Sequence, residues 1–252
     1  MKASFPTLRV GKEAFTDLNR VAYRPPLFLA SLMTATLHAL RIAAHDPHAL
    51  ERFWSGLLGR AIEETGFRLS FVRSDEPKTR QNQMHFDLTS ESLEDQRRTV
   101  AKALELGGRH IDVGQLPEEK HVVLADPEGN EFCVIEPGND FLAECGFVGA
   151  VASDGSQEVG YFWSKALGWP LVWDQDQETA IRSPHGGPKI TWGGPPFTPK
   201  TGPNRLRFVL TGPLSEVERL VSLGAARLGA GRDGQVEMAD PDGNEFSVMV
   251  PR

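Results

Sequence analysis

The octapeptide ADPEGNEF, from Ala125 to Phe132, returns near the end of the chain as ADPDGNEF, from Ala239 to Phe246. Seven of the eight positions are identical, and the two copies lie 114 residues apart in a chain of 252. A match of this length at nearly half the chain length is typical of a duplicated fold unit. The sequence therefore predicts two copies of one fold unit.

Further pairs of residues repeat in the same order around this turn. Phe53-Trp54 returns as Phe162-Trp163, and His85-Phe86 corresponds to Arg207-Phe208. The spacing differs from pair to pair, so insertions separate the copies without changing their order. We place an N-terminal extension at 1–33, a first domain at 34–138, a linker at 139–144 and a second domain at 145–252.

The N-terminal extension has no counterpart in the second copy. Two interpretations stay open for it. One is a misassigned gene start, with translation beginning at Met33, just before the first repeated strand. The other is a docking arm ahead of the repeated body.

Composition excludes several classes of function. Residues 34–252 carry 22 Lys and Arg against 32 Asp and Glu, which disfavours nucleic acid and anionic membranes as partners. Two cysteines, Cys133 and Cys145, exclude a disulfide framework and suit a reducing compartment. The apolar run Leu27 to Leu37 falls short of the ~18 residues of a membrane span. We expect a cytoplasmic monomer or homodimer whose partner is a small molecule.

Local patterns predict an α+β fold in which each copy alternates strands and helices. The first copy has a strand at 37–44 and a helix at 48–58, where Asp46-Pro47 provides a favourable helix start. In Asp126-Pro-Glu-Gly-Asn130, the residue types match a tight reversal between two strands. Residues 183–204 of the second copy are half Gly and Pro, which predicts a loop with one short strand near 190–192.

This order of elements resembles the glyoxalase-like branch of the vicinal oxygen chelate superfamily, which also contains bleomycin-resistance proteins. The resemblance rests on the Asp-Pro helix with Phe-Trp, the strand that carries His85, and the repeated Asp-Pro-acid-Gly-Asn turn. It implies two tandem glyoxalase-like domains, each a pair of βαβββ modules forming a cup-shaped mixed sheet with helices outside. Members commonly hold a divalent metal in the cup, where it polarises substrate oxygens.

The positions that the resemblance assigns to metal ligands are changed in this chain. Cys133 and Ser247 stand where a Glu is expected, and the first-strand positions are Ala39 and Phe147. A catalytic metal needs three protein ligands of the His or carboxylate type. We therefore expect no metal or other cofactor. The alternative is a divalent metal in an unconventional site around His85.

The same positions suggest that a small organic ligand is bound in one or both cups. Phe71, Phe147 and Trp192 would give such a pocket apolar walls, with Arg207 as a polar anchor. A guanidinium on the inward face favours an anionic group. The alternative for Arg207 is an outward side chain whose stem lies on the surface.

His85 and Cys133 also allow a thiolate activated by an imidazole. Against this, Cys133 lies in the apolar strand Phe-Cys-Val-Ile, and Ser247 at the matching place indicates a requirement for small size. The catalytic residues stay unassigned. Three functions remain: a metal-free small-molecule-binding protein, a metal-dependent lyase or dioxygenase, and a scaffold used only for assembly.

Overall fold

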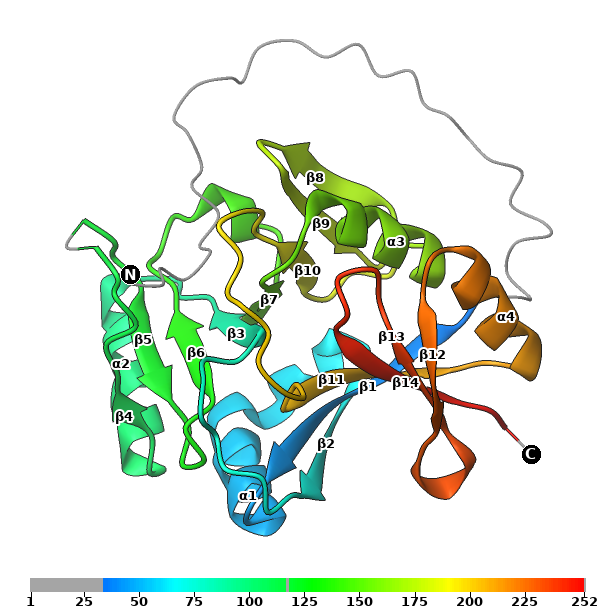
Figure 1. Cartoon of the computed structure of the whole chain (residues 1–252). Coiled ribbons are helices and arrows are strands. Elements are labelled where there is room, and N and C mark those ends of the chain that lie inside the picture. Colours follow the sequence, from blue (N-terminus) through cyan, green and yellow to red (C-terminus); the bar gives the residue numbers. More distant parts are fainter. Residues whose placement is uncertain (1–33, 117, 252) are drawn as a thin grey trace, which may run out of the picture.

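The computed structural model describes residues 34–116 and 118–251, and shows four successive modules (Figure 1). The N-terminal extension, with its two interpretations, lies outside the described residues. Module one contains β1 (Thr36–Ala44), α1 (Pro47–Leu58), the 3-10 helix η2 (Gly59–Thr65) and β2 (Arg68–Arg73). Module two contains β3 (Met84–Leu88), α2 (Leu93–Glu105), β4 (Arg109–His110), β5 (Val122–Ala125) and β6 (Glu131–Val134).

The second copy follows after the 3-10 helix η3 (Asp140–Leu142). Module three contains β7 (Val148–Ser153), α3 (Gln157–Leu167), β8 (Leu171–Gln175), β9 (Glu178–Arg182) and β10 (Lys189–Trp192). Module four contains β11 (Leu206–Thr211), α4 (Leu214–Ser222), β12 (Ala226–Ala230), the 3-10 helix η4 (Arg232–Gly234), β13 (Val236–Ala239) and β14 (Glu245–Met249). The strand predicted within the Gly- and Pro-rich segment is β10.

Helix α1 shows how the local sequence sets these boundaries. The Asp46 side chain accepts a hydrogen bond from the Ala49 backbone N–H, which satisfies one of the free donors at the helix start. Pro47 occupies the first turn, where its missing N–H costs nothing. The buried face then consists of Leu50, Phe53, Trp54, Leu57 and Leu58.

The strands form two sheets, and each sheet contains one module from each copy. The six-stranded sheet has the order β12-β13-β14-β11-β1-β2 and joins modules one and four. The eight-stranded sheet has the order β4-β5-β6-β3-β7-β10-β9-β8 and joins modules two and three. These elements confirm the α+β class. The two modules that share a sheet come from different copies, whereas the resemblance implied that they come from the same copy.

Module one is shorter than the other three. Its strand β2 pairs in parallel with β1, as β6 pairs with β3 and β14 with β11. In the described residues of module one, only 59–67 separate α1 from β2, and most of them form η2. This length leaves no room for the two hairpin strands that precede the last strand elsewhere.

Two matching tryptophan–aspartate hydrogen bonds connect the two sheets. In the first copy, Trp54 Nε1 of α1 donates to Asp126 Oδ2 at 3.1 Å; in the second, Trp163 Nε1 of α3 donates to Asp240 Oδ2 at 3.2 Å. Each bond runs from the helix of one module to the repeated turn of the next. Edge-to-face contacts accompany them, with ring centroids 5.2 Å apart for Trp54 and Phe132.

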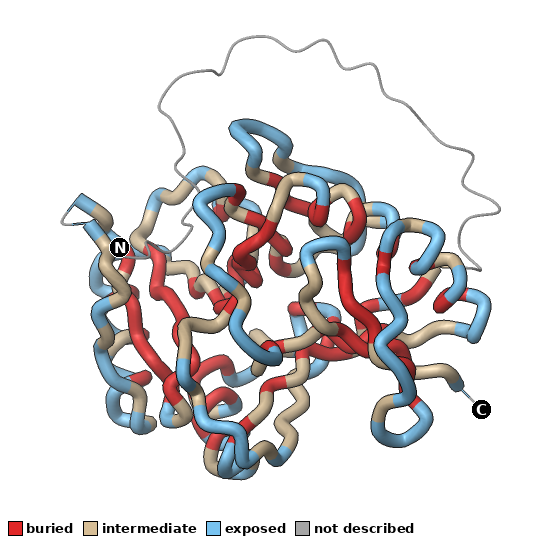
Figure 2. The backbone as a smooth tube through the Cα atoms, viewed as in Figure 1, coloured by how far each residue is buried: buried red, intermediate tan, exposed pale blue. Residues whose placement is uncertain are grey.

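The main core lies between the two sheets, around these aromatic residues. Buried stretches follow the central strands of both sheets, whereas β8, β12 and most connecting loops are exposed (Figure 2). Helices α2 and α4 lie at opposite ends of the molecule (Figure 1). No helix in 34–116 or 118–251 is long and apolar enough to cross a membrane.

The repeated turns supply a test of backbone strain. Gly129 and Gly243 adopt φ values of 84° and 82°, a region that side chains with a β-carbon rarely enter. We expect Gly129→Val and Gly243→Val each to lower the free energy of unfolding by about 1 kcal/mol or more. A β-carbon at Gly243 would meet no atom within 4 Å, so the stability lost on its substitution is attributed to the positive φ rather than to a clash of the β-carbon. Chemical denaturation that left both variants at wild-type stability would contradict this assignment of the turns.

The buried turn aspartates supply a test of pH dependence. Burial raises the pKa of Asp126 to about 6, although hydrogen bonds from Asn130 and Trp54 act in the opposite direction. Because the folded pKa exceeds the ordinary value, this group stabilises the fold most at low pH, and that contribution is lost as the pH rises through about 6. The stability advantage of wild type over Asp126→Asn should therefore be smaller at about pH 7.5 than at about pH 4.5. An advantage that grows with pH would show instead that the folded state favours the ionised carboxylate.

Candidate functional site

Two arginines face each other on the concave side of the six-stranded sheet. Arg41 of β1 lies directly opposite Arg207 of β11 in the antiparallel ladder. Like charges in this arrangement repel, so they need nearby counter-charges or a bound anion. The pairing therefore places two cationic side chains from different copies at one point.

Both arginines belong to a polar network on the floor of this sheet. Arg41 Nη2 donates to Gln235 Oε1 at 2.7 Å, and Arg41 Nη1 approaches Ser247 Oγ at 3.4 Å. The Ser247 hydroxyl donates to Glu237 Oε1 at 2.9 Å. Arg207 Nη1 lies 3.6 Å from Glu237 Oε2. Glu237 is thus the carboxylate that links the two guanidiniums.

Burial lowers the pKa of Arg41 below its ordinary value, whereas the charge of Glu237 raises it. Arg207 and Arg232 add to the lowering, and Asp233 opposes it. A guanidinium remains charged under such perturbation. The floor of the sheet therefore carries fixed positive charge that is partly removed from water.

A cavity of about 890 Å³ opens above these residues. Its sides come from three loops of the chain, at 73–83, 201–204 and 230–233. Arg80 joins two of them, because its Nη2 donates to Asn204 Oδ1 at 2.8 Å and its Nε donates to the Thr201 carbonyl at 3.1 Å. The first and second copies therefore build the cavity together.

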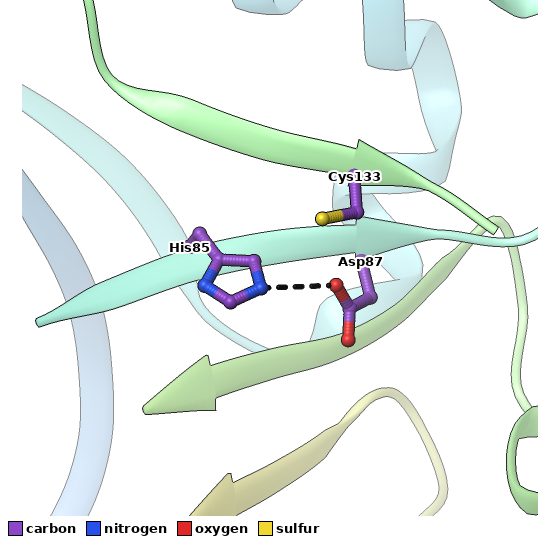
Figure 3. A group of neighbouring side chains, drawn as sticks. All are labelled: His85, Asp87 and Cys133. Atoms are coloured by element: carbon purple, nitrogen blue, oxygen red, sulfur yellow. Dashed lines mark ion pairs between the residues drawn. The ribbon is translucent and has the colours of Figure 1, made fainter. Parts of the chain in front are cut away.

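The eight-stranded sheet holds a different group of side chains (Figure 3). His85 and Asp87 are two residues apart on β3 and project to the same side, and Asp87 pairs with Cys133 of β6. His85 Nε2 lies 3.3 Å from Asp87 Oδ1. The ligand atoms of all three residues lie within 4.8 Å of one another.

Cys133 is fully buried in this group. Burial raises the pKa of its thiol well above the ordinary range, and the neighbouring charge of Asp87 acts in the same direction. Since the thiolate is the nucleophilic form, these surroundings oppose the activated-thiol interpretation. A small buried thiol agrees with Ser247 at the matching position of the second copy, which is also fully buried.

The linker covers this side of the eight-stranded sheet. Leu142 of η3 packs in one buried cluster with Cys133 and Ala150, and Phe141 adjoins that cluster. Lys189 of β10 lies over the Phe141 ring, 4.1 Å from its centroid, and its Nζ also donates to the Phe141 carbonyl. Protein side chains thus occupy space above this sheet that is open above the other.

The two sheets differ in how well they fit a metal ion. On the six-stranded sheet, the inward positions of the first and last strands include Arg41, Arg207, Ser247 and Ser70. Two guanidiniums repel a cation, so these residues do not fit a divalent metal. On the eight-stranded sheet, imidazole, carboxylate and thiol form a donor set that suits zinc. The matching strands of module three contribute Ala150, Ala152 and Thr191, so only half of that site carries strong donors.

The structure places the predicted pocket residues in several different places. Arg207 lines the cavity and Ser247 lies beneath it. His85 and Cys133 lie together on the other sheet. Phe147 lines a separate hollow beside the linker.

Phe71 and Trp192 do not line the 890 Å³ cavity, which corrects the expectation for both. Phe71 pairs with Ile42, so it projects to the core side of β2 while Ser70 and Val72 take the cavity side. Trp192 is buried in the main core, where its ring adjoins Gly155. In both cases a one-residue difference of register on a strand decides the face.

Sequence reasoning missed Arg41, Glu237 and Asp87. Arg41 lies two residues after Ala39, the position that the resemblance assigned to the inward face, and strand periodicity could have identified it. Asp87 lies two residues after His85 and carries the same signal. Glu237 belongs to the hairpin strand β13, where no motif indicates its role.

Comparisons with known proteins agree with this architecture. The family model of the glyoxalase-like domain matches residues 39–135 and, a second time, residues 150–249. No curated protein matches the sequence.

Solved structures share the fold at low sequence identity. Glyoxalase I from Zea mays has a TM-score of 0.57 and 13% identity, over 86% of this chain and 92% of that one. A Bacillus subtilis protein described as a candidate dioxygenase has a TM-score of 0.56 and 12% identity, over 86% of this chain and 85% of that one. At such identity the likeness shows the fold alone. With two matched segments that together span most of its length, the chain belongs to the glyoxalase-like domain family, within the vicinal oxygen chelate superfamily, as a tandem-domain protein.

Proposed function

We propose that this protein binds a small organic anion in the cavity of the six-stranded sheet, without a metal ion at that site. The observation that supports the proposal is the Arg41 and Arg207 pair on the floor of a cavity of about 890 Å³. Cavities of roughly 300–1,000 Å³ are typical of small-molecule sites. The guanidiniums take the place of a metal as the cationic group.

The surroundings favour a carboxylate or a similar oxyanion as the charged group. Guanidinium donors match the planar geometry of a carboxylate, and charge-assisted hydrogen bonds are the stronger kind. Arg207 keeps about a quarter of its side chain exposed toward the cavity, at 26%. Its Nε donates to the Asn204 carbonyl at 2.9 Å, which orients the guanidinium. The pocket is thus preorganised for an anion.

The rest of the lining indicates what the body of the ligand meets. The apolar part consists of small and cyclic side chains: Ala43, Val72, Pro77, Pro203 and Ala230. Asn82, Asn204, Thr79 and Thr201 add amide and hydroxyl groups. Such a lining accepts an apolar body with polar substituents.

A metal-dependent lyase or dioxygenase is the second candidate, and His85, Asp87 and Cys133 favour it. In such an enzyme these three side chains would hold the ion, which would act as a Lewis acid on substrate oxygens. None of the three lines the 890 Å³ cavity. The packing of the linker over Cys133 also leaves substrate without the access that the other sheet provides. We therefore place ligand binding on the six-stranded sheet, with assembly alone as the outcome if nothing binds.

Replacing Arg207 tests the anion site. Arg207→Met keeps the apolar stem and removes the charge, so titration calorimetry with benzoate should show binding weaker by about 1.5–3 kcal/mol. Benzamide, the neutral analogue, should bind weakly to both proteins. His85→Gln alters the other sheet and should leave benzoate affinity unchanged. Equal binding of benzoate and benzamide to wild type would remove the case for an anion site.

Metal content separates the two candidates. Elemental analysis of untagged protein after gentle purification should find less than a stoichiometric amount of divalent metal, because two guanidiniums occupy one cup and only half of the donor positions are filled in the other. One tightly held zinc, iron, nickel or manganese ion per chain, lost in His85→Ala, would instead support the enzyme at the eight-stranded sheet.

A further inference from the structure

We infer that the cavity selects a ligand with a single negative charge, a monocarboxylate, over a dianion. This inference rests on the proposed function and specifies the charge of the ligand. It comes from the balance of fixed charges around the cavity, considered first at the floor and then over the whole lining.

At the floor and in the exposed hairpin beside it, three guanidiniums face two carboxylates. The guanidiniums belong to Arg41, Arg207 and Arg232, and the carboxylates belong to Glu237 and Asp233. Glu237 cannot withdraw easily, because it holds the Ser247 hydroxyl at 2.9 Å and faces Arg207 at 3.6 Å. The local excess is therefore one positive charge, and a bound monoanion neutralises it.

The whole lining gives the same balance. Its cationic side chains are Arg41, Arg73, Lys78, Arg80, Arg205, Arg207 and Arg232, and its acidic side chains are Glu76, Asp233 and Glu237. Three of the cations are ion-paired with acids just outside the lining: Lys78 with Glu131, Arg205 with Glu128, and Arg73 with Asp75. Once those pairs are included, one positive charge is again in excess.

A second negative charge would have no fixed partner in this cavity. Charges that are partly removed from water interact more strongly than they do in bulk solvent, so repulsion from Glu237 opposes a dianion. The exposed lysines and arginines elsewhere on the surface are screened by salt and give little compensation. Selection should therefore depend on Glu237 more than on the number of cations.

A matched set of probes tests this dependence. Benzoate is a monoanion, whereas phthalate and phenyl phosphate are both dianions at about pH 8, one with two carboxylates and one with a phosphate. Calorimetry on the full chain should show benzoate binding at least about fivefold more tightly than either dianion. Phthalate and phenyl phosphate together separate the effect of charge from that of the carboxylate itself.

Glu237→Gln supplies the decisive comparison. Removal of this negative charge raises the local excess of positive charge from one to two. Phthalate affinity should therefore rise about tenfold, whereas benzoate affinity should change less than about threefold. Asp233→Asn also removes one negative charge from the cavity lining, at the exposed hairpin. It keeps the test valid if Glu237→Gln lowers stability. Glu94→Gln, an exposed acid on α2, is the control and should change neither affinity.

The outcomes are distinguishable. No binding of any anion to wild type would overturn the proposed function, and the inference with it. Binding of benzoate that requires Arg207, together with equal or tighter binding of phthalate, would overturn the charge selection alone. An unchanged preference for benzoate in both Glu237→Gln and Asp233→Asn would also overturn it, because the charge balance would then have no effect.

Discussion

The antiparallel pairing of β1 with β11 is the interaction on which the rest of the structure depends. It joins the first module of one copy to the last module of the other, and it places Arg41 opposite Arg207. β3 and β7 form the equivalent pairing between the two inner modules. Each sheet is therefore built from residues of both copies. Because each sheet contains strands of both copies, neither copy forms a complete cup by itself.

The Trp–Asp hydrogen bonds complement this strand pairing. Strands connect modules of different copies, whereas Trp54 and Trp163 connect successive modules within a copy. The two kinds of contact together hold the two sheets around one core. Duplication followed by divergence on this framework has left one concave face open and cationic, and the other covered by the linker.

Sequence patterns predicted the strand at 37–44, the helix at 48–58, the repeated turns and the short strand near 190–192, because capping, periodicity and turn chemistry are local. They did not disclose the pairing of modules, since in a tandem repeat each module offers similar edges to two partners. The site was predicted in part. Arg207 emerged from comparison of the copies, whereas Arg41 gains its meaning only from the ladder that brings it opposite Arg207. Phe71 and Trp192 were misplaced because a one-residue change of strand register exchanges the faces of a sheet.

A crystal structure of the protein soaked with benzoate is the measurement that tests the central claim most directly. The account predicts a carboxylate bound on the six-stranded sheet, within hydrogen-bonding distance of Arg207 and close to Arg41, with no metal beside it. Benzoate on the eight-stranded sheet next to His85 and Cys133, or a metal ion held by those residues and contacting the ligand, would contradict it.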